Sequence, residues 1–571
     1  MMRKFLIAAS VMALTVGLSG PAHADTLVDN IKGETIAADG TAQTFIGLLF
    51  DDGGVIKAVY GPRDRLPKQG RNGYQYHIDG KGRVLLPGMI DAHAHMIQTG
   101  FALLTLDLSD TVSLDDALDR IGKFAKAHPD RPWILGSGWN QERWHMGRFP
   151  TAAELDRVVP DRPVWLERAD FHAGWANSAA LKAAGVTAAT PTPDGGAIDR
   201  LPDHSPAGVL IDHARDLVAR AVPAPLPRDL DLALATAEAD FAKRGITAVA
   251  DMGTTLGDWM AFRRAGDGNH LYVRIMSYAM GTDAMAEIGG SGPTPWLYAD
   301  KLHMGGLKLL LDGALGSRGA WLKAPYADQP GAAGTPLYSE TQLGNLMSRA
   351  AMDHYQVAVH AIGDKANETL LTTIYDLTHT YSGDRRWRIE HAQIVDPKNW
   401  PLVAEIAHAG GIVASMQPVH QTSDRPMAEA RLGPDRLRGA YAWNSLKAQG
   451  AVLAFGSDTP VERPDPWTGI AVALTRQDET GAPAGGWQPQ ERVDRLTAFA
   501  AYTSAAAWAG FAETKFGRIA PGLRADFILV DTDPMTATPE AIRKTKVFQT
   551  WVGGGKTYDA EPDAPVSKPK K

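Results

Sequence analysis

The sequence predicts an α/β protein built on a closed barrel of eight parallel strands, a (β/α)8 or TIM barrel, and two observations predict it. Eight short apolar runs occur in the central part of the chain, and most of them are separated by a stretch with helical periodicity. Repeated units of strand then helix favour a parallel sheet closed into a barrel. The runs are Met89 to Ala92, Ile246 to Ala250, Tyr272 to Tyr278, Gly306 to Leu311, Gln356 to Val359, Trp387 to Ile389, Gly411 to Ser415 and Val452 to Phe455.

Length and composition agree with a barrel that carries additions. The chain has 571 residues, of which 44% are hydrophobic and 22% charged, values that exclude disorder or a fibre as the main state. The formal net charge of -7 gives no reason to expect nucleic acid or an anionic membrane as a partner, because both bind concentrated basic surfaces. We therefore expect a small-molecule substrate, and a homo-oligomer is left open.

The first residues, 1–24, are typical of a secretory signal peptide. Arg3 and Lys4 precede an apolar run, and the small-residue segment that ends at Ala24 predicts cleavage before Asp25. The alternative, a membrane anchor, would need about 20 apolar residues, and this run is shorter. We predict an exported, periplasmic protein that has no membrane attachment after cleavage. The chain has no cysteine, so disulfides and thiolate ligands are excluded.

The two ends of the mature chain are predicted to form one small β unit. Residues 25–86 alternate short apolar runs with Asp-Gly and Gly-Pro turn signals and show no helical periodicity, which indicates antiparallel strands. Similar runs return within residues 511–558, at Asp526 to Val530 and Lys546 to Val552. The remaining residues, 559–571, are rich in proline, lysine and aspartate and are predicted to be a mobile tail.

The barrel itself is expected to span residues 87–510, with a subdomain inserted at about 100–227. The chain between the first two predicted strands is far too long for an ordinary crossover. An insertion after the first strand would lie over the barrel mouth, where such folds place their sites. It holds five tryptophans, which cover substrate or, alternatively, form a simple core. They are Trp133, Trp139, Trp144, Trp165 and Trp175.

Residues of metal-ligand type occur where the predicted strands end. His93 and His95 are spaced by one residue, so on a strand both side chains point to the same side and can hold one metal ion. A His-X-His pair alone is weak evidence for a metal site. Three further residues strengthen it: His360 and His391 follow the fifth and sixth strands, and Asp458 lies two residues beyond the eighth strand.

Lys308 is a charged residue in an otherwise apolar strand, Gly306 to Leu311. A buried lysine has to form an ion pair or lose its charge. One solution is capture of carbon dioxide by the neutral amine, which gives a carbamate that can bridge two cations. The alternative is a salt bridge to a carboxylate such as Asp458.

At this point the sequence resembles the amidohydrolase superfamily, in particular the amidohydrolase family 3 branch that includes the N-substituted formamide deformylases. The resemblance covers nearly the whole mature chain. It is carried by Pro87 to His95, Asp170-Phe171-His172, Asp312 to Arg318, His360 to Asp364, Arg388 to Gln393, Met416-Gln417-Pro418 and Gly456 to Val461.

The resemblance implies a binuclear metal site. His93, His95 and Asp458 would hold one metal ion, His360 and His391 would hold the other, and a carboxylated Lys308 would bridge them. It also implies that the two terminal β segments form the family's composite sandwich. The family often has Gly-Trp-Asp where this chain has Gly138-Trp139-Asn140, so no acidic role is carried over to Asn140.

The resemblance implies hydrolysis of a carbon–nitrogen bond in a small amide, N-acyl or formamide-like compound, and the ligand types predict the mechanism. A divalent cation with an open position lowers the pKa of bound water to about 7 and polarises a carbonyl. Asp458 would accept the proton and return it to the leaving nitrogen. Imidazole favours zinc, although other divalent metals and a single ion stay open. The alternatives are a metal-dependent esterase or lactonase and a catalytically silent binding protein.

Three further residues are candidates for contact with the substrate. His172, in the insertion, is predicted to bind the substrate or stabilise the tetrahedral oxygen, against a structural hydrogen-bonding role. Arg318 can bind a substrate carboxylate or form a structural ion pair. Trp139 is the third substrate-binding candidate. His420, placed on a loop after the seventh strand, is either a residue of the pocket or an ordinary loop histidine, and the second interpretation is favoured.

Overall fold

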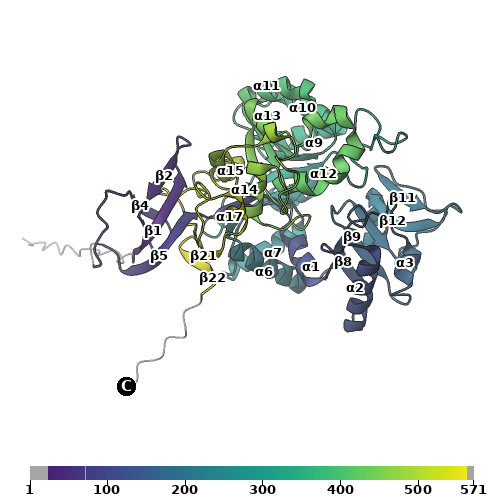
Figure 1. The fold of residues 1–571 in the computed structure, drawn as a ribbon, viewed down its shortest axis with the longest axis horizontal. Helices are drawn as coiled ribbons and strands as arrows, with labels where there is room; N and C mark the ends of the chain where they lie inside the picture. The colour runs from purple at the N-terminus through teal and green to yellow at the C-terminus, as the bar shows by residue number, and fades with distance from the viewer. Residues whose placement is uncertain (1–23, 71–72, 562–571) are drawn as a thin grey trace, which may run out of the picture.

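The computed structural model describes residues 24–70 and 73–561 (Figure 1). The predicted signal peptide, except for its last residue, and most of the predicted tail lie outside the described residues. Within the described ranges, no helix combines the length and the apolar character needed to cross a membrane.

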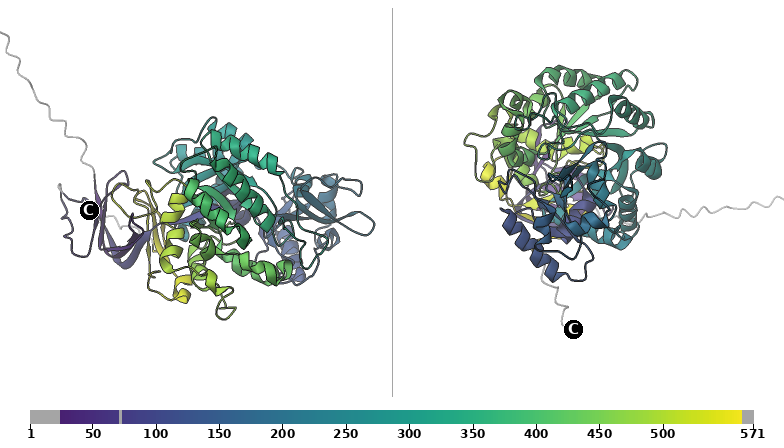
Figure 2. Two further views of the ribbon diagram at one scale, coloured as in Figure 1. Left: turned by 90° about the horizontal axis from the view of Figure 1, so that it is seen from above. Right: turned by 90° about the vertical axis from the view of Figure 1, so that its right-hand side faces the viewer.

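The central element is the predicted barrel. Its eight strands are all parallel and follow one another in sequence order, and each contains or overlaps one of the predicted runs. Surrounding helices cover them on the outside (Figure 2). The strands are β6 (Met89–Ala94), β13 (Ile246–Thr254), β14 (Arg274–Met280), β15 (Leu302–Leu310), β16 (Gln356–Ala361), β17 (Trp387–His391), β18 (Ile412–Met416) and β19 (Val452–Phe455).

The barrel is closed between β6 and the turn that follows β19. The Asp458 amide donates to the His93 carbonyl at 2.7 Å, and the His95 amide donates to the Thr459 carbonyl at 2.9 Å. Gly456 permits this approach, because a Cβ at that position would lie 2.5 Å from the His93 nitrogen. The first and last barrel strands therefore meet at the ligand-type residues His93, His95 and Asp458.

Helices form where the sequence combines capping residues with apolar residues at spacings of three and four. In α9, Ser339 and Gln342 form a capping box, and the buried face carries Leu343, Met347 and Ala350. The barrel and terminal helices are α1 (Met96–Leu104), α6 (Pro227–Lys243), α7 (Leu256–Asp267), α8 (Gly281–Gly289), α9 (Glu340–Met352), α10 (Asp364–Thr378), α11 (Trp400–Gly410), α12 (Pro418–Leu432), α13 (Trp443–Ala448), α14 (Pro466–Thr475), α15 (Arg495–Ala501), α16 (Ser504–Ala509) and α17 (Pro539–Arg543), with short 3-10 turns at Pro397–Asn399, Pro434–Gly439 and Pro489–Glu491.

Helices α1 and α6 pack closely because of one glycine. A Cβ on Gly100 would lie 2.0 Å from the carbonyl oxygen of Ala233. Any side chain at this position would push α1 away from α6, so the start of the insertion is fixed against the barrel wall.

The two chain ends do come together, in one continuous hydrogen-bonded sheet of eight strands. Strand β5 pairs in parallel with β1 and antiparallel with β20, so it joins the amino-terminal strands to the carboxyl-terminal ones. The sheet is clamped to the barrel by a buried ion pair between Arg274 and Asp526, with nitrogen–oxygen distances of 2.6 and 2.7 Å. Its strands are β1 (Thr26–Ile36), β2 (Ala42–Phe45), β3 (Gly47–Phe50), β4 (Ile56–Tyr60), β5 (Tyr76–Pro87), β20 (Phe527–Val530), β21 (Val547–Val552) and β22 (Gly555–Asp559).

The insertion folds as a separate six-stranded sheet with helices. It lies at the opposite end of the molecule from the terminal sheet (Figure 1). Trp139, Trp144 and Trp175 pack together in its core. Its elements are β7 (Leu106–Asp107), α2 (Leu114–Ala127), β8 (Ile134–Trp139), α3 (Ala152–Asp156), β9 (Val164–Arg168), β10 (Ala173–Ala176), α4 (Ser178–Ala183), β11 (Gly196–Arg200), β12 (Pro206–Asp212), a 3-10 turn at His213–Arg215 and α5 (Asp216–Ala219).

Candidate active site

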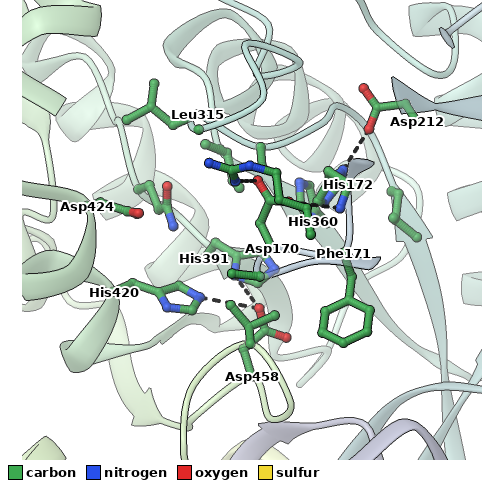
Figure 3. A pocket seen from close by; sticks show the side chains of 18 of the residues that line it. Asp170, Phe171, His172, Asp212, Leu315, His360, His391, His420, Asp424 and Asp458 are labelled. Carbon is green, nitrogen blue, oxygen red and sulfur yellow. Dashed lines mark hydrogen bonds and ion pairs between the residues drawn. The ribbon is translucent and has the colours of Figure 1, made fainter. Parts of the chain in front are cut away.

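A cavity of about 550 Å³ lies between the carboxyl ends of the barrel strands and the insertion (Figure 3). It is lined from the barrel side by His95, Lys308, His360, His391 and Asp458, from the insertion by Asp170, Phe171, His172 and Asp212, and from α12 by His420 and Asp424. Five of the six predicted metal ligands therefore line the cavity. The sixth, His93, is fully buried, and its Nε2 lies 3.3 Å from Asp458 Oδ1 and 3.4 Å from Lys308 Nζ.

His93, His95 and Asp458 form the most compact group. Asp458 Oδ1 lies 3.3 Å from His93 Nε2 and 3.1 Å from His95 Nε2, and each residue offers a ligand atom within 4.8 Å of the other two. Against the effect of burial, the electrostatic interaction with His93 and the hydrogen bonds from His420, His93 and His95 hold the pKa of Asp458 well below its usual value. The carboxylate is therefore ionised at neutral pH, as a metal ligand has to be.

His93 is held in place by a buried carboxylate. Glu390 Oε2 lies 2.6 Å from His93 Nδ1, and Glu390 Oε1 accepts from Arg388 Nε at 2.7 Å. Although burial opposes ionisation, the charge of Arg388 and the hydrogen bond from His93 hold the pKa of Glu390 far below its usual value. The Nδ1 hydrogen of His93 thus points at Glu390, which leaves Nε2 to face Asp458 and Lys308.

His360 and His391 supply two further imidazoles at the ends of β16 and β17. Their ring centroids are 4.6 Å apart. Burial, reinforced by neighbouring charged groups, lowers the pKa of both well below the ordinary value, so both rings are neutral, the form that binds metal. His391 Nδ1 lies 2.9 Å from Gln417 Oε1, and His391 adopts a left-handed backbone with φ of 73°. Such strain is typical of functional positions.

Lys308 reaches the same group from β15. Its Nζ lies 3.4 Å from His93 Nε2, and the side chain is 3% exposed. Burial lowers its pKa to about 8. In the described part of the chain no carboxylate lies within ion-pair distance of this amine, so the expected alternative of a direct salt bridge to Asp458 is not seen.

His420 was interpreted as an ordinary loop histidine, and the structure corrects this. It lies in the first turn of α12, is 6% exposed, and places Nε2 3.3 Å from Asp458 Oδ2. Its Nδ1 lies 3.4 Å from Glu462 Oε1. His391, His420 and Asp458 form a second group whose ligand atoms lie within 4.8 Å of one another. Pro418, which follows Met416-Gln417, could have indicated that a helix and not a loop begins here, because proline favours the first turn of a helix.

The insertion contributes His172, as its position over the barrel mouth suggested. The ring lines the cavity and its centroid lies 5.2 Å from that of His360. His172 Nδ1 lies 2.7 Å from Asp212 Oδ1. Although burial opposes it, this carboxylate raises the pKa of His172. Sequence reasoning did not identify Asp212, which is 40 residues away along the chain.

The other two substrate-contact candidates lie outside the cavity lining. Trp139 is fully buried in the core of the insertion, where its indole donates to the Leu166 carbonyl at 2.7 Å. Its predicted contact with substrate is therefore not supported by the structure. Arg318 forms an ion pair with Asp328 at 2.9 Å, which is the structural role given as its alternative.

The donor set fits a divalent metal centre. Burial lowers the pKa of His93, His360 and His391, which favours their neutral form. One ring nitrogen of His93 faces Glu390 and one of His391 faces Gln417, which leaves the other nitrogen of each available. Among the described residues His360 Nε2 has no hydrogen-bond partner, and it lies 3.5 Å from Asp312 Oδ1. Histidine nitrogens together with an ionised aspartate are ligands that zinc and similar ions accept.

Comparisons with known proteins identify related hydrolases. The sequence model of the amidohydrolase family matches residues 77–558. The chain is 33% identical to the putative amidohydrolase YtcJ of Bacillus subtilis over 90% of this chain and 96% of that protein. It is 27% identical to the N-substituted formamide deformylase of Arthrobacter pascens, over 84% and 90% of the two chains. A solved structure, an uncharacterized metal-dependent hydrolase from Pyrococcus furiosus, is 26% identical with a TM-score of 0.68 and covers 90% of this chain and 100% of its own.

Proposed function

Because the chain belongs to the amidohydrolase family, we propose that the cavity binds zinc and hydrolyses a small amide, N-acyl or formamide-type compound. The chain is a metal-dependent hydrolase that acts on carbon–nitrogen bonds other than peptide bonds. The observation that carries the proposal is the compact group of His93, His95 and Asp458 at the cavity, with ligand atoms within 4.8 Å of one another.

When bound, the metal would acidify a water molecule and polarise the substrate carbonyl. The chain supplies the rest of the chemistry. Asp458 is ionised and lies at the cavity, so its carboxylate accepts the proton of the attacking water and returns it to the leaving nitrogen. His93 and His391 are kept in fixed orientations by Glu390 and Gln417, so the ligand set is formed before substrate enters.

Lys308 is proposed to react with carbon dioxide and to bridge two metal ions as a carbamate. Two observations support this. The amine lies 3.4 Å from His93 Nε2 without a carboxylate partner among the described residues, and burial lowers its pKa to about 8, which makes the neutral, nucleophilic form accessible. With this bridge, His93, His95 and Asp458 would hold one ion, and His360 and His391 would hold the other.

His172 is proposed to contact the reacting amide from the insertion side. It lines the cavity opposite the barrel ligands and lies next to His360. The cavity wall around it is partly apolar, with Phe171, Leu315 and Ile362, which suits a small organic substrate rather than a polymer.

Export to the periplasm is proposed from residues 1–24 alone. Amino-terminal sequencing of the protein recovered from the periplasm of a bacterial host tests it. A first residue of Asp25 is expected, and an uncleaved chain retained in the cytoplasm would contradict the proposal.

The test of the site combines metal content with turnover. The full mature protein, purified without chelator, is measured by mass spectrometry and assayed on paired amide and ester analogues of N-acyl and formamide compounds. We expect one or two zinc ions per chain and a preference for the amides. His93→Ala should lose metal and activity together. His303→Ala is a matched control, because His303 lies at the amino-terminal start of β15 and does not line the active-site cavity. A protein without tightly bound metal that remains inactive after added zinc or manganese would refute the proposal.

A further inference from the structure

Asp212 occupies an unusual position at the end of β12. It is followed by a 3-10 turn, and its backbone has φ of 47° and ψ of -126°, which is rare for a residue with a side chain. The Asp212 amide donates to the His172 carbonyl at 2.8 Å, so the two residues are tied through both backbone and side chain. Strained backbone of this kind persists where the surrounding structure enforces it, commonly at functional sites.

The side-chain contact determines which nitrogen of His172 meets the cavity. A carboxylate at this distance only accepts, so the hydrogen lies on His172 Nδ1. Among the described residues Nε2 has no hydrogen-bond partner, and the ring lines the cavity beside His360. Figure 3 shows the ring held between Asp212 and the cavity. Nε2 is therefore the atom available to the substrate.

The loop after β15 receives the second oxygen of the carboxylate. A Cβ on Gly313 would lie 2.7 Å from Asp212 Oδ2, and a Cβ on Gly319 would lie 2.6 Å from the same oxygen. Neither glycine has a positive φ, so space limits a side chain there: Asp212 Oδ2 is the nearest atom to either Cβ, and the Cα of the other glycine follows at 3.0 or 3.1 Å. Gly313, the first glycine of the motif from Asp312 to Arg318, therefore leaves room for the Asp212 carboxylate, which the sequence of the motif does not reveal.

We propose that Asp212 is a positioning residue that fixes His172, so that Nε2 from the insertion meets the reacting amide above the barrel ligands. Gly313 and Gly319 keep the space in which the carboxylate sits. The inference rests on the proposed hydrolysis at the barrel mouth. It gives the insertion a direct part in the reaction, in addition to covering the cavity.

A double-mutant cycle tests whether Asp212 acts through His172. Asp212→Asn keeps the volume of the side chain but removes its charge and permits the other tautomer of His172. We expect kcat to fall by about 10- to 100-fold, with KM little changed, because the lost interaction forms in the transition state. In a His172→Ala background the same substitution should change kcat by less than about twofold. A purely structural Asp212 would instead lower kcat by the same factor in both backgrounds, which would overturn the proposal.

A second variant leaves both polar residues in place. Gly319→Ala would displace the Asp212 carboxylate, since the atom in its way is the end of a flexible side chain. It should reproduce the fall in kcat of Asp212→Asn and have no further effect when His172 is alanine. Gly331→Ala is the matched control, because a Cβ there has no atom within 4 Å. Wild-type kcat in Gly319→Ala or in Asp212→Asn would overturn the positioning role.

Metal content distinguishes a failure of the proposed hydrolase function from a failure of the proposed role of Asp212. We expect all of these variants to retain the metal content of the parent protein. If the parent itself holds no metal and shows no turnover, the proposed function fails. If the parent is active and the cycle is additive, only the role of Asp212 fails.

Discussion

Replacement of Glu390 by glutamine tests how the barrel interior supports the ligand set. The substitution keeps the size of the side chain and removes its charge. Three contacts of Glu390 change: the one to His93 Nδ1 at 2.6 Å and the two to Arg388, from Nε at 2.7 Å and from Nη2 at 3.3 Å. Glu390 is 0% exposed and Arg388 is 1% exposed, so water cannot replace the lost charge.

The substitution is expected to change two quantities, the free energy of unfolding and the metal affinity. A buried charge left without its partner costs about 3 to 5 kcal/mol. Arg388 keeps hydrogen bonds to the Ala92 carbonyl at 2.8 Å and to Tyr278 at 3.2 Å, so we expect the lower end of that range. The second effect is on metal affinity. Loss of the carboxylate that orients a ligating histidine weakens binding by about 10- to 100-fold, which corresponds to roughly 1.4 to 2.7 kcal/mol.

Urea denaturation of the metal-free protein and zinc titration measure the two effects independently. The control is the double variant Glu390→Gln with Arg388→Met, in which the unpaired guanidinium is gone. We expect the double variant to regain most of the stability, but not the zinc affinity. Zinc affinity equal to that of the parent protein in Glu390→Gln would refute the idea that this carboxylate orients His93, and would leave it only the role of counter-ion to Arg388.

Three further predictions follow from other parts of the structure. Lys308→Ala should lower the metal content measured by mass spectrometry and reduce kcat by at least about 100-fold; unchanged metal content would contradict a bridging role. Burial raises the pKa of Glu238 from 4.5 to about 7, so the stability it contributes is present below its unfolded pKa and is lost as pH rises through 7. Glu238→Gln should therefore raise the free energy of unfolding by about 1 to 3 kcal/mol at pH 8 and not at pH 4, and an equal gain at both pH values would argue against this cause. Gly100→Ala should destabilise by about 1 to 3 kcal/mol in thermal unfolding, because its Cβ would meet the Ala233 carbonyl, and an unchanged melting temperature would show that α1 can shift freely.

The barrel was predictable because its strands are short, apolar and bounded by turns. The run Val452 to Phe455 coincides with β19, and the run Gln356 to Val359 begins where β16 begins. Most of the other strands extend further at their carboxyl ends than predicted, for example to Thr254 in β13, because hydrogen bonding to neighbouring strands continues past the apolar run, whereas β15 ends one residue earlier than predicted. The six predicted ligands converge because they lie within or shortly after five strands of one closed sheet, β6, β15, β16, β17 and β19, towards the carboxyl ends of these strands.

What escaped prediction depends on contacts between distant segments. His420 reaches Asp458 and Glu462 because α12 begins at the cavity, and a period of 3.6 is difficult to detect in a helix that contains Pro426. Trp139 carries no sequence signal that separates a core indole from a substrate contact. Asp212 meets His172 through pairing of β10 with β12, a register that composition does not encode.

The terminal sheet has a consequence for the order in which the molecule can assemble. Strand β5 pairs with β20, which starts at Phe527, so one edge of the amino-terminal strands has no partner until nearly the whole chain has been synthesised. Pairing over such a separation is slow, and an open strand edge is a site for association with other chains while it waits. A chain that stops before Phe527 would hold every ligand residue of the cavity and still lack the segment that protects β5. The yield of folded enzyme is then controlled by the arrival of the last strands, and not by the barrel that performs the chemistry.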